Sequence, residues 1–218
     1  MNKEWSELNK TMQAQIKKKD TYKMGIDTLF NLRRQLMQTL VSFKEDLCRE
    51  DFNAIPFINA DSYHSKTIAY SIWHIFRIED IVAHTVITED EQVFFTGNYQ
   101  VRINSPIITT GNELVKQQIA DFSKQLNLEE LYSYIFEVRE STEKILERFS
   151  YDELKWKIPD ERKGYLKSLN VVNCDEKAIW LIDYWCSKDI RGLIQMPFSR
   201  HWIMHTEACL RIKNKMHS

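Results

Sequence analysis

Apolar residues recur every three or four positions over several long stretches of the chain, which is the spacing of one face of an α-helix. In the stretch from Gly25 to Cys48 the apolar stripe consists of Leu29, Leu32, Leu36, Leu40, Phe43 and Leu47. The same period appears from Ser62 or Ser65 to Ile87, from Leu128 to Phe149, and from Pro197 onward. We therefore predict four long helices, with Asn127 as the N-cap of the third and Pro197 in the first turn of the last.

Shorter periodic stretches predict further helices at 113–126 and 175–187, whereas 88–112 looks irregular because it contains Gly97 and Pro106. The chain has only 5 Gly and 4 Pro, and the prolines lie between the periodic stretches or at the start of one. Few helix breakers and four long helices predict an all-α protein, a four-helix bundle with additional short helices. We interpret 1–218 as one domain, with 1–20 as a peripheral segment.

The charge pattern argues against several classes of partner. The sequence has 30 Lys and Arg against 31 Asp and Glu, a net charge of -1, so no overall field favours nucleic acid or an anionic membrane. Basic runs such as Arg33-Arg34 are interpreted as solvated helix faces. The N-terminus lacks a signal-peptide pattern, and no apolar run approaches the length of a membrane span. The four cysteines show no C-x-x-C spacing, which favours reduced thiols in a cytoplasmic protein.

Two histidines near the C-terminus, His201 and His205, are the most informative residues. Side chains four residues apart project from one face of a helix, which is the spacing with which one helix offers two nitrogen ligands to a metal. On a helical wheel both lie in the apolar arc with Phe198 and Ile212. A buried imidazole needs a partner for each nitrogen, and a metal would supply one. The alternative is a pair of core histidines hydrogen-bonded to backbone or carboxylate groups.

A catalytic site of the zinc type usually has three protein ligands. The candidates for the third are His64, His74 and His84. The wheel of the second predicted helix places His84 in a solvent-facing arc with Lys66, Arg77 and Asp80, and His64 lies close to a loop. We select His74, in the middle of that helix on the shoulder of its apolar face.

The same wheel places Glu79 among apolar residues, where an ionised carboxylate is unfavourable without a partner. Arg200, next to His201, is a plausible partner. One interpretation is a buried ion pair between helices. The functional alternative makes Glu79 a hydrogen-bond acceptor for a metal ligand, or a general base.

With these residues in view, the chain resembles the DinB-like (YfiT-like) family of metal-dependent helical bundles. The resemblance is carried by Ile72-Trp73-His74-Ile75-Phe76-Arg77-Ile78-Glu79-Asp80 and by Met196-Pro197-Phe198-Ser199-Arg200-His201-Trp202-Ile203-Met204-His205. It implies an up-down-down-up four-helix bundle, frequent homodimers, and zinc or nickel bound by His74, His201 and His205. Members include low-molecular-weight-thiol transferases, a thiol-dependent isomerase and annotated hydrolases. Thr206-Glu207-Ala208 stands where Arg-Gly-Gln is common, which departs from the thiol-transferase pattern.

We therefore expect a metalloenzyme in which the bound ion activates water or a thiol toward a small-molecule substrate. The alternative is a non-catalytic, stress-related dimeric helical protein whose histidines are structural or bind metal without turnover. We also expect a homodimer, because apolar residues such as Ile203 and Leu210 lie opposite the histidine face. Metal affinity is expected to fall below about pH 6.5, the ordinary histidine pKa.

Overall fold

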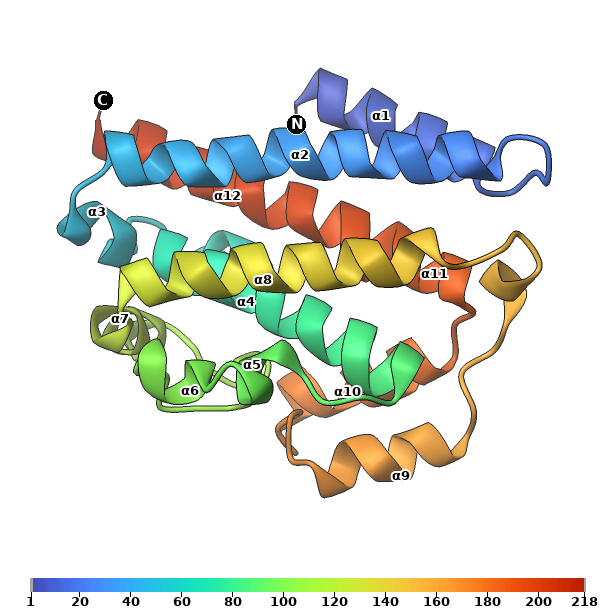
Figure 1. The fold of residues 1–218 in the computed structure, drawn as a ribbon. Helices are drawn as coiled ribbons and strands as arrows, with labels where there is room; N and C mark the ends of the chain where they lie inside the picture. The colour runs from blue at the N-terminus through green and yellow to red at the C-terminus, as the bar shows by residue number, and fades with distance from the viewer. Residues whose placement is uncertain (1, 218) are drawn as a thin grey trace.

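The computed structural model describes residues 2–217 (Figure 1), which form helices and connecting turns without a β-strand. One isolated bridge pairs Lys157 with Asp189. The all-α prediction is confirmed. In the described part of the chain no helix combines the length and the apolar composition needed to cross a membrane.

Four long helices pack around a common core: α2 (Tyr22–Asp46), α4 (Ile68–Asp80), α8 (Leu128–Glu147) and α12 (His201–Met216). Helix α2 contacts α8 and α12, and α4 contacts the same two helices from the other side. In Figure 1, α4 and α8 run from left to right, whereas α2 and α12 run from right to left. Asn127 caps α8 as predicted. Helix α4 is capped by Thr67, whose side chain accepts from the Tyr70 amide, rather than by Ser62 or Ser65.

Two of these helices adjoin wider, π-helical turns. Helix α4 continues into η2 (Ile81–Thr88), and η4 (Met196–Arg200) leads directly into α12. Pro197 lies in the first turn of η4. Backbone amides in a first turn have no partner within the helix, so the missing amide proton of proline costs no helical hydrogen bond there. Turns of this kind are rare and occur frequently at functional sites. Here one of them immediately precedes His201.

Further helices, most of them shorter, surround the four long ones. They are α1 (Lys3–Gln15), α3 (Arg49–Asn53), η1 (Ser62–His64), α5 (Val93–Thr96), α6 (Tyr99–Arg102), α7 (Gln117–Gln125), η3 (Glu153–Lys155), α9 (Glu161–Ser168), α10 (Glu176–Cys186) and α11 (Ile190–Gln195). Helix α1 lies along α2 (Figure 1) and buries Trp5 and Met12, so most of the segment expected to be peripheral is packed on the bundle.

Helix α4 is buried along its whole length, which contradicts the solvent-facing arc predicted for it. Arg77 and Asp80 have no exposed surface, and His84 in η2 is 6% exposed. The cover is supplied by α5 and α7, which pack on α4, and by α9 and α10, which pack on η2. Asp80 accepts hydrogen bonds from the amides of Val93 and Phe94 at the start of α5. The wheel was wrong because helices distant in sequence cover the polar side of α4.

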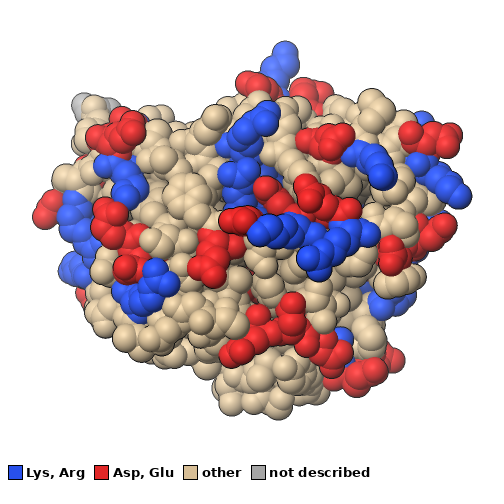
Figure 2. Space-filling view, in the orientation of Figure 1, with Lys and Arg blue, Asp and Glu red and all other residues tan. Residues whose placement is uncertain are grey.

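The strip of apolar residues opposite the histidines of α12 is also covered within the chain. Ile203 is 5% exposed and belongs to the main core, and Leu210 packs against that core. This strip therefore no longer argues for a dimer. The face formed by α2 and α8 carries acidic and basic side chains next to one another (Figure 2).

Candidate metal centre and cavity

The three histidines singled out from the sequence lie together in the structure. His74 comes from the middle of α4, His201 is the first residue of α12, and His205 follows one turn later. One nitrogen from each ring can be chosen so that all three lie within 4.8 Å of one another. Three nitrogens bound to one tetrahedral ion at about 2.0–2.1 Å would lie about 3.4 Å apart. Small side-chain rotations would close this difference.

A short hydrogen bond fixes the orientation of His74. Its Nδ1 lies 2.6 Å from the carbonyl oxygen of Thr110. Because a carbonyl oxygen only accepts, Nδ1 carries the proton, and Nε2 of the neutral ring keeps a free lone pair. The Tyr70 ring stacks on His74 at 5.3 Å, and the Tyr70 hydroxyl donates to the carbonyl of Gly111 at 2.8 Å. The 110–111 loop is thus held from two sides, as expected for a group that orients a metal ligand.

The other two rings are left partly unpartnered. Nδ1 of His201 and Nδ1 of His205 are buried and have no hydrogen-bond partner. An unsatisfied buried polar atom costs about 1–3 kcal/mol, so native structures seldom keep one without a reason. Either nitrogen of an imidazole can bind zinc or nickel, so two adjacent rings that each keep an unsatisfied nitrogen fit a metal ion at this position.

Burial also keeps the three rings in the form that binds metal. It lowers the pKa of His201 to about 4. The pKa values of His74 and His205 are held well below the usual range by burial first, and second by the repulsion that a protonated ring would meet from the neighbouring histidines. All three imidazoles are therefore neutral near pH 7, and their lone pairs are available to a metal. The predicted loss of affinity near pH 6.5 shifts to more acidic conditions for the folded protein.

The histidines line a cavity of about 610 Å³, which is within the range of small-molecule sites. Its other walls come from η1, α4, the loop before α7, helix α10 and the turn η4. The lining residues are Ser62, Tyr63, Ser65, Lys66, Tyr70, His74, Ile78, Asn112, Leu114, Val115, Lys177, Trp180, Leu181, Tyr184, Trp185, Met196, Pro197, His201, Met204 and His205. The candidate ligands thus face a space large enough for a small molecule.

Glu79 lies elsewhere, in a second buried cluster that adjoins the same two helices. Its carboxylate forms a two-pronged ion pair with Arg33 of α2, at 2.7 and 2.9 Å, and accepts from the indole of Trp202 at 2.7 Å. Arg33 is fully buried, so the solvated-face interpretation of Arg33-Arg34 was wrong at this position, and Arg200, which is exposed, is not the partner. Glu79 does not line the cavity.

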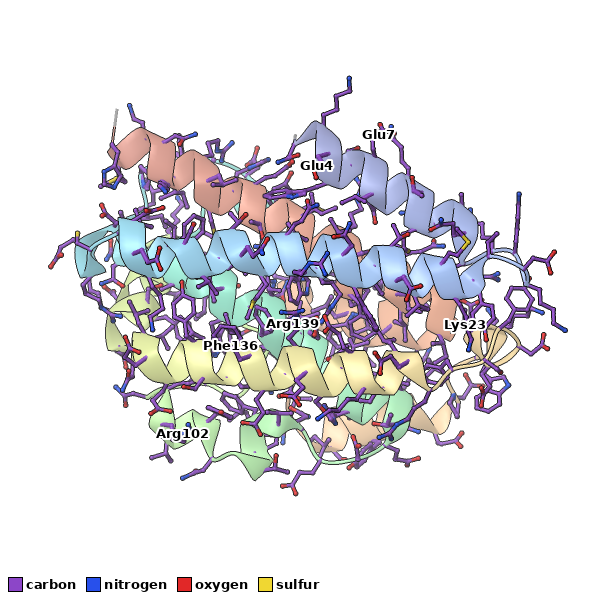
Figure 3. The ribbon with its side chains drawn as sticks, turned by 45° about the horizontal axis from the view of Figure 1, so that its top comes forward. Glu4, Glu7, Lys23, Arg102, Phe136 and Arg139 are labelled. Atoms are coloured by element: carbon purple, nitrogen blue, oxygen red, sulfur yellow. The ribbon has the colours of Figure 1, made fainter. Side chains whose placement is uncertain are left out.

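The rest of the Arg33 guanidinium is also bound. It donates to Glu143 of α8 at 3.1 Å and to the carbonyl of Phe198 at 3.2 Å. Arg139, which projects from α8 (Figure 3), donates to the same Glu143. The cluster therefore ties α2, α4, α8 and η4 together. The interpretation of Glu79 as part of a buried ion pair between helices agrees with these contacts.

The two other candidates for the third ligand, His64 and His84, are not part of the cluster. His84 places Nδ1 2.6 Å from Asp90 and Nε2 3.1 Å from Ser141, so both its nitrogens have partners. His64, in η1, packs at a tilt against Tyr63 with ring centroids 4.0 Å apart, and Tyr63 in turn lies 5.8 Å from the His205 ring. Among the described residues, the one group of three or more potential metal ligands found is His74, His201 and His205.

Sequence reasoning missed Lys66 and Tyr70 as cavity residues, although a signal was present. Tyr70, His74 and Ile78 are spaced four apart and share one face of α4, and Lys66 lies four residues before Tyr70, just ahead of the N-cap Thr67. Thr110 carried no signal, because its contribution is a backbone carbonyl from a distant loop.

A scan of protein-family models finds no match to this chain, and a search of curated proteins finds no similar sequence.

Proposed function

We propose that this chain is a metal-dependent enzyme of the DinB-like type, with a zinc or nickel ion bound by His74, His201 and His205. The observation that carries the proposal is the pair of buried, neutral and unpartnered imidazole nitrogens of His201 and His205, next to His74 on the wall of a small-molecule cavity. A purely structural histidine cluster would be expected to satisfy these atoms within the protein.

The family assignment has further support in the course of the long helices. An up-down-down-up bundle requires the first and fourth long helices to run opposite to the second and third, which agrees with the directions of α2, α4, α8 and α12 in Figure 1. The same assignment proposes a homodimer. Sedimentation equilibrium at micromolar concentration tests this point, and a species of 26.1 kDa alone would contradict it.

When bound, the ion would supply a Lewis acid that lowers the pKa of a coordinated water or thiol and polarises an electrophile. The chain's own residues have separate roles. The Thr110 carbonyl holds His74 in the tautomer whose Nε2 is free, and the Tyr70 ring holds the face of that imidazole. The apolar and aromatic lining limits the water around the reacting groups. Glu79 is assigned to positioning of α12 through Trp202 and not to proton transfer.

Cobalt substitution tests the proposal and distinguishes an ion that activates a thiol from an ion that activates water. Untagged protein is stripped of metal and loaded with Co²⁺, and its visible absorption is recorded with and without a low-molecular-weight thiol such as glutathione. We expect ligand-field bands of a low-coordinate ion, absent in His205→Ala. A new thiolate-to-cobalt charge-transfer band on adding the thiol favours a thiol-dependent reaction. Unchanged bands favour activation of water, and a spectrum of free aqueous cobalt contradicts the proposal.

A further inference from the structure

The charged groups that line the cavity all belong to basic side chains. Its described lining residues include Lys66 and Lys177 but no Asp or Glu. This differs from the face in Figure 2, where both signs alternate. A cavity lined by one sign of charge concentrates ligands of the opposite sign.

Neither lysine has a carboxylate partner in the described part of the chain, although many other basic side chains do, such as Lys163 with Asp183 at 2.7 Å. The Lys66 Nζ lies over the Tyr70 ring, 5.0 Å from its centroid. Burial, followed by repulsion from Lys177, lowers the pKa of Lys66 to about 8. Two ammonium groups that repel each other across a partly enclosed space, with no carboxylate of the described residues at ion-pair distance from either, suit an anion as ligand.

Helix α10 places an aromatic wall beside this charge. Lys177, Trp180, Leu181 and Tyr184 follow the i, i+3, i+4, i+7 pattern of one helix face, so that face of α10 lines the cavity. Trp180 is 50% exposed, and its indole nitrogen donates to the Lys177 carbonyl at 2.9 Å, which fixes the ring next to that lysine. Tyr184 packs on the Trp180 ring at 5.7 Å. An exposed large aromatic side chain held in place beside a cavity suits an apolar ligand body.

The spacing of these groups sets the approximate length of the ligand. The Tyr70 ring is close to both centres, since its centroid lies 5.0 Å from Lys66 Nζ and 5.3 Å from the centroid of the His74 ring. Lys66 Nζ is therefore no more than about 10 Å from the His74 ring. A molecule about the size of a phenyl ring with a short side chain reaches from one to the other.

We propose that this cavity binds a small molecule with an anionic group at one end, a carboxylate or a phosphate, held by Lys66 and Lys177, and an apolar body against Trp180 and Tyr184. The proposal rests on the proposed function, since it names the substrate class of that same site. It assigns Lys66 and Lys177 to substrate binding and orientation. The reacting end of the molecule then points toward His74, His201 and His205.

The test uses three probes on the full chain: 3-phenylpropionate, phenyl phosphate, and the neutral 3-phenylpropionamide. Dissociation constants are measured by isothermal titration calorimetry at low and high salt, with protein that is metal-free and protein loaded with zinc. We expect the carboxylate or the phosphate to bind metal-free protein at least 10-fold more tightly than the amide, and more weakly at high salt. The tighter of the two anions identifies the preferred group.

The double variant Lys66→Gln/Lys177→Gln should lose at least 10-fold in anion affinity and leave amide binding unchanged. The double variant Lys144→Gln/Lys155→Gln removes two exposed lysines that do not line the cavity, and should bind like wild type. Lys66→Arg keeps the charge and should recover part of the affinity. Equal affinity of wild type for anion and amide, or an anion affinity that the lysine variants leave intact, overturns the proposal.

Zinc stoichiometry measured on the same samples separates this proposal from the proposed function. Selective anion binding without zinc binding refutes the metal centre and leaves the lysine site in place. Zinc binding without selective anion binding refutes the lysine site alone. Anion binding that occurs only with zinc, and with the same affinity in wild type and in the lysine variants, shows that the anion coordinates the ion. This outcome also refutes the lysine site.

Discussion

Two buried polar clusters involve the same two helices, α4 and α12, and they differ in how far the protein satisfies them. In the first, the Glu79 carboxylate accepts from Arg33 and Trp202, and both its oxygens are bound. In the second, Nδ1 of His201 and Nδ1 of His205 are buried without partners. The first cluster faces α2 and η4, whereas the second faces a cavity. A network in which every polar atom has a hydrogen-bond partner holds helices together. A network with unpartnered nitrogen atoms leaves those atoms free to bind a ligand such as a metal ion.

The cost of each cluster supports the same distinction. The attraction within a buried ion pair in good geometry offsets most of its desolvation cost. Removing only one of the two partners is strongly destabilising, because the other charge stays buried without a partner. The unpartnered imidazoles have no such compensation inside the protein and would destabilise the metal-free chain. Changes in the first cluster should therefore lower stability, and changes in the second should lower metal binding.

The largest effect is expected from Glu79→Gln, which leaves the fully buried Arg33 without its two-pronged partner. We expect a loss of about 3–5 kcal/mol in the free energy of unfolding, the usual cost of breaking a buried pair. Urea denaturation followed by circular dichroism measures it. Glu143→Gln is the matched control, since Arg33 keeps Glu79 in that variant, and it should cost far less. The folded Glu79→Gln protein should still bind zinc, and loss of zinc from the folded fraction would break the distinction between the clusters.

The second effect concerns the ligands themselves. His205→Ala should reduce zinc affinity by more than about 100-fold, beyond the 10–100-fold typical of residues that only support a ligand. Competition with a chromogenic zinc chelator measures the change. His84→Ala is the control, because His84 is also a buried histidine but has partners for both nitrogens. Equal losses in the two variants would contradict the assignment.

A smaller effect is expected from pH in the metal-free protein. The folded-state pKa of His201, about 4, lies below the ordinary value of 6.5, so the unfolded chain takes up a proton first as the pH falls. The free energy of unfolding of the metal-free protein therefore decreases as the pH falls below about 6.5, and it is fully present above that pH. Between pH 7.5 and 5.5 the His201→Gln variant should lose about 1.4 kcal/mol less than wild type, one pKa unit for one group. Urea titrations at the two pH values check this, and identical pH dependence would contradict it.

The smallest effect is expected at the support of His74. Tyr70→Phe removes the hydrogen bond to the Gly111 carbonyl and should cost about 1 kcal/mol of stability. It should also weaken zinc binding by about 10-fold, because the 110–111 loop that holds His74 loses one of its two anchors. Thermal denaturation and chelator competition measure the two quantities. A loss of stability with unchanged zinc affinity would show that the loop does not orient His74.

The sequence predicted the elements of the fold and the histidine cluster because both depend on short-range periodicity. The stripe from Leu29 to Leu47 and the four-residue spacing of His201 and His205 are visible within one helix. The environment of α4 and η2 was mispredicted because α5 and α7 cover α4, and α9 and α10 cover η2, and a single-helix wheel does not include these helices. Arg33 was missed for the same reason, since its partners lie 46 and 110 positions away.

The most direct test of the central claim is a calorimetric titration of zinc into untagged, metal-free protein. We expect one ion per chain for wild type, with binding abolished in His201→Ala/His205→Ala and retained in His84→Ala. No binding by wild type, or equal binding by the double variant, would contradict the claim that the unpartnered imidazoles of α12 form a metal site.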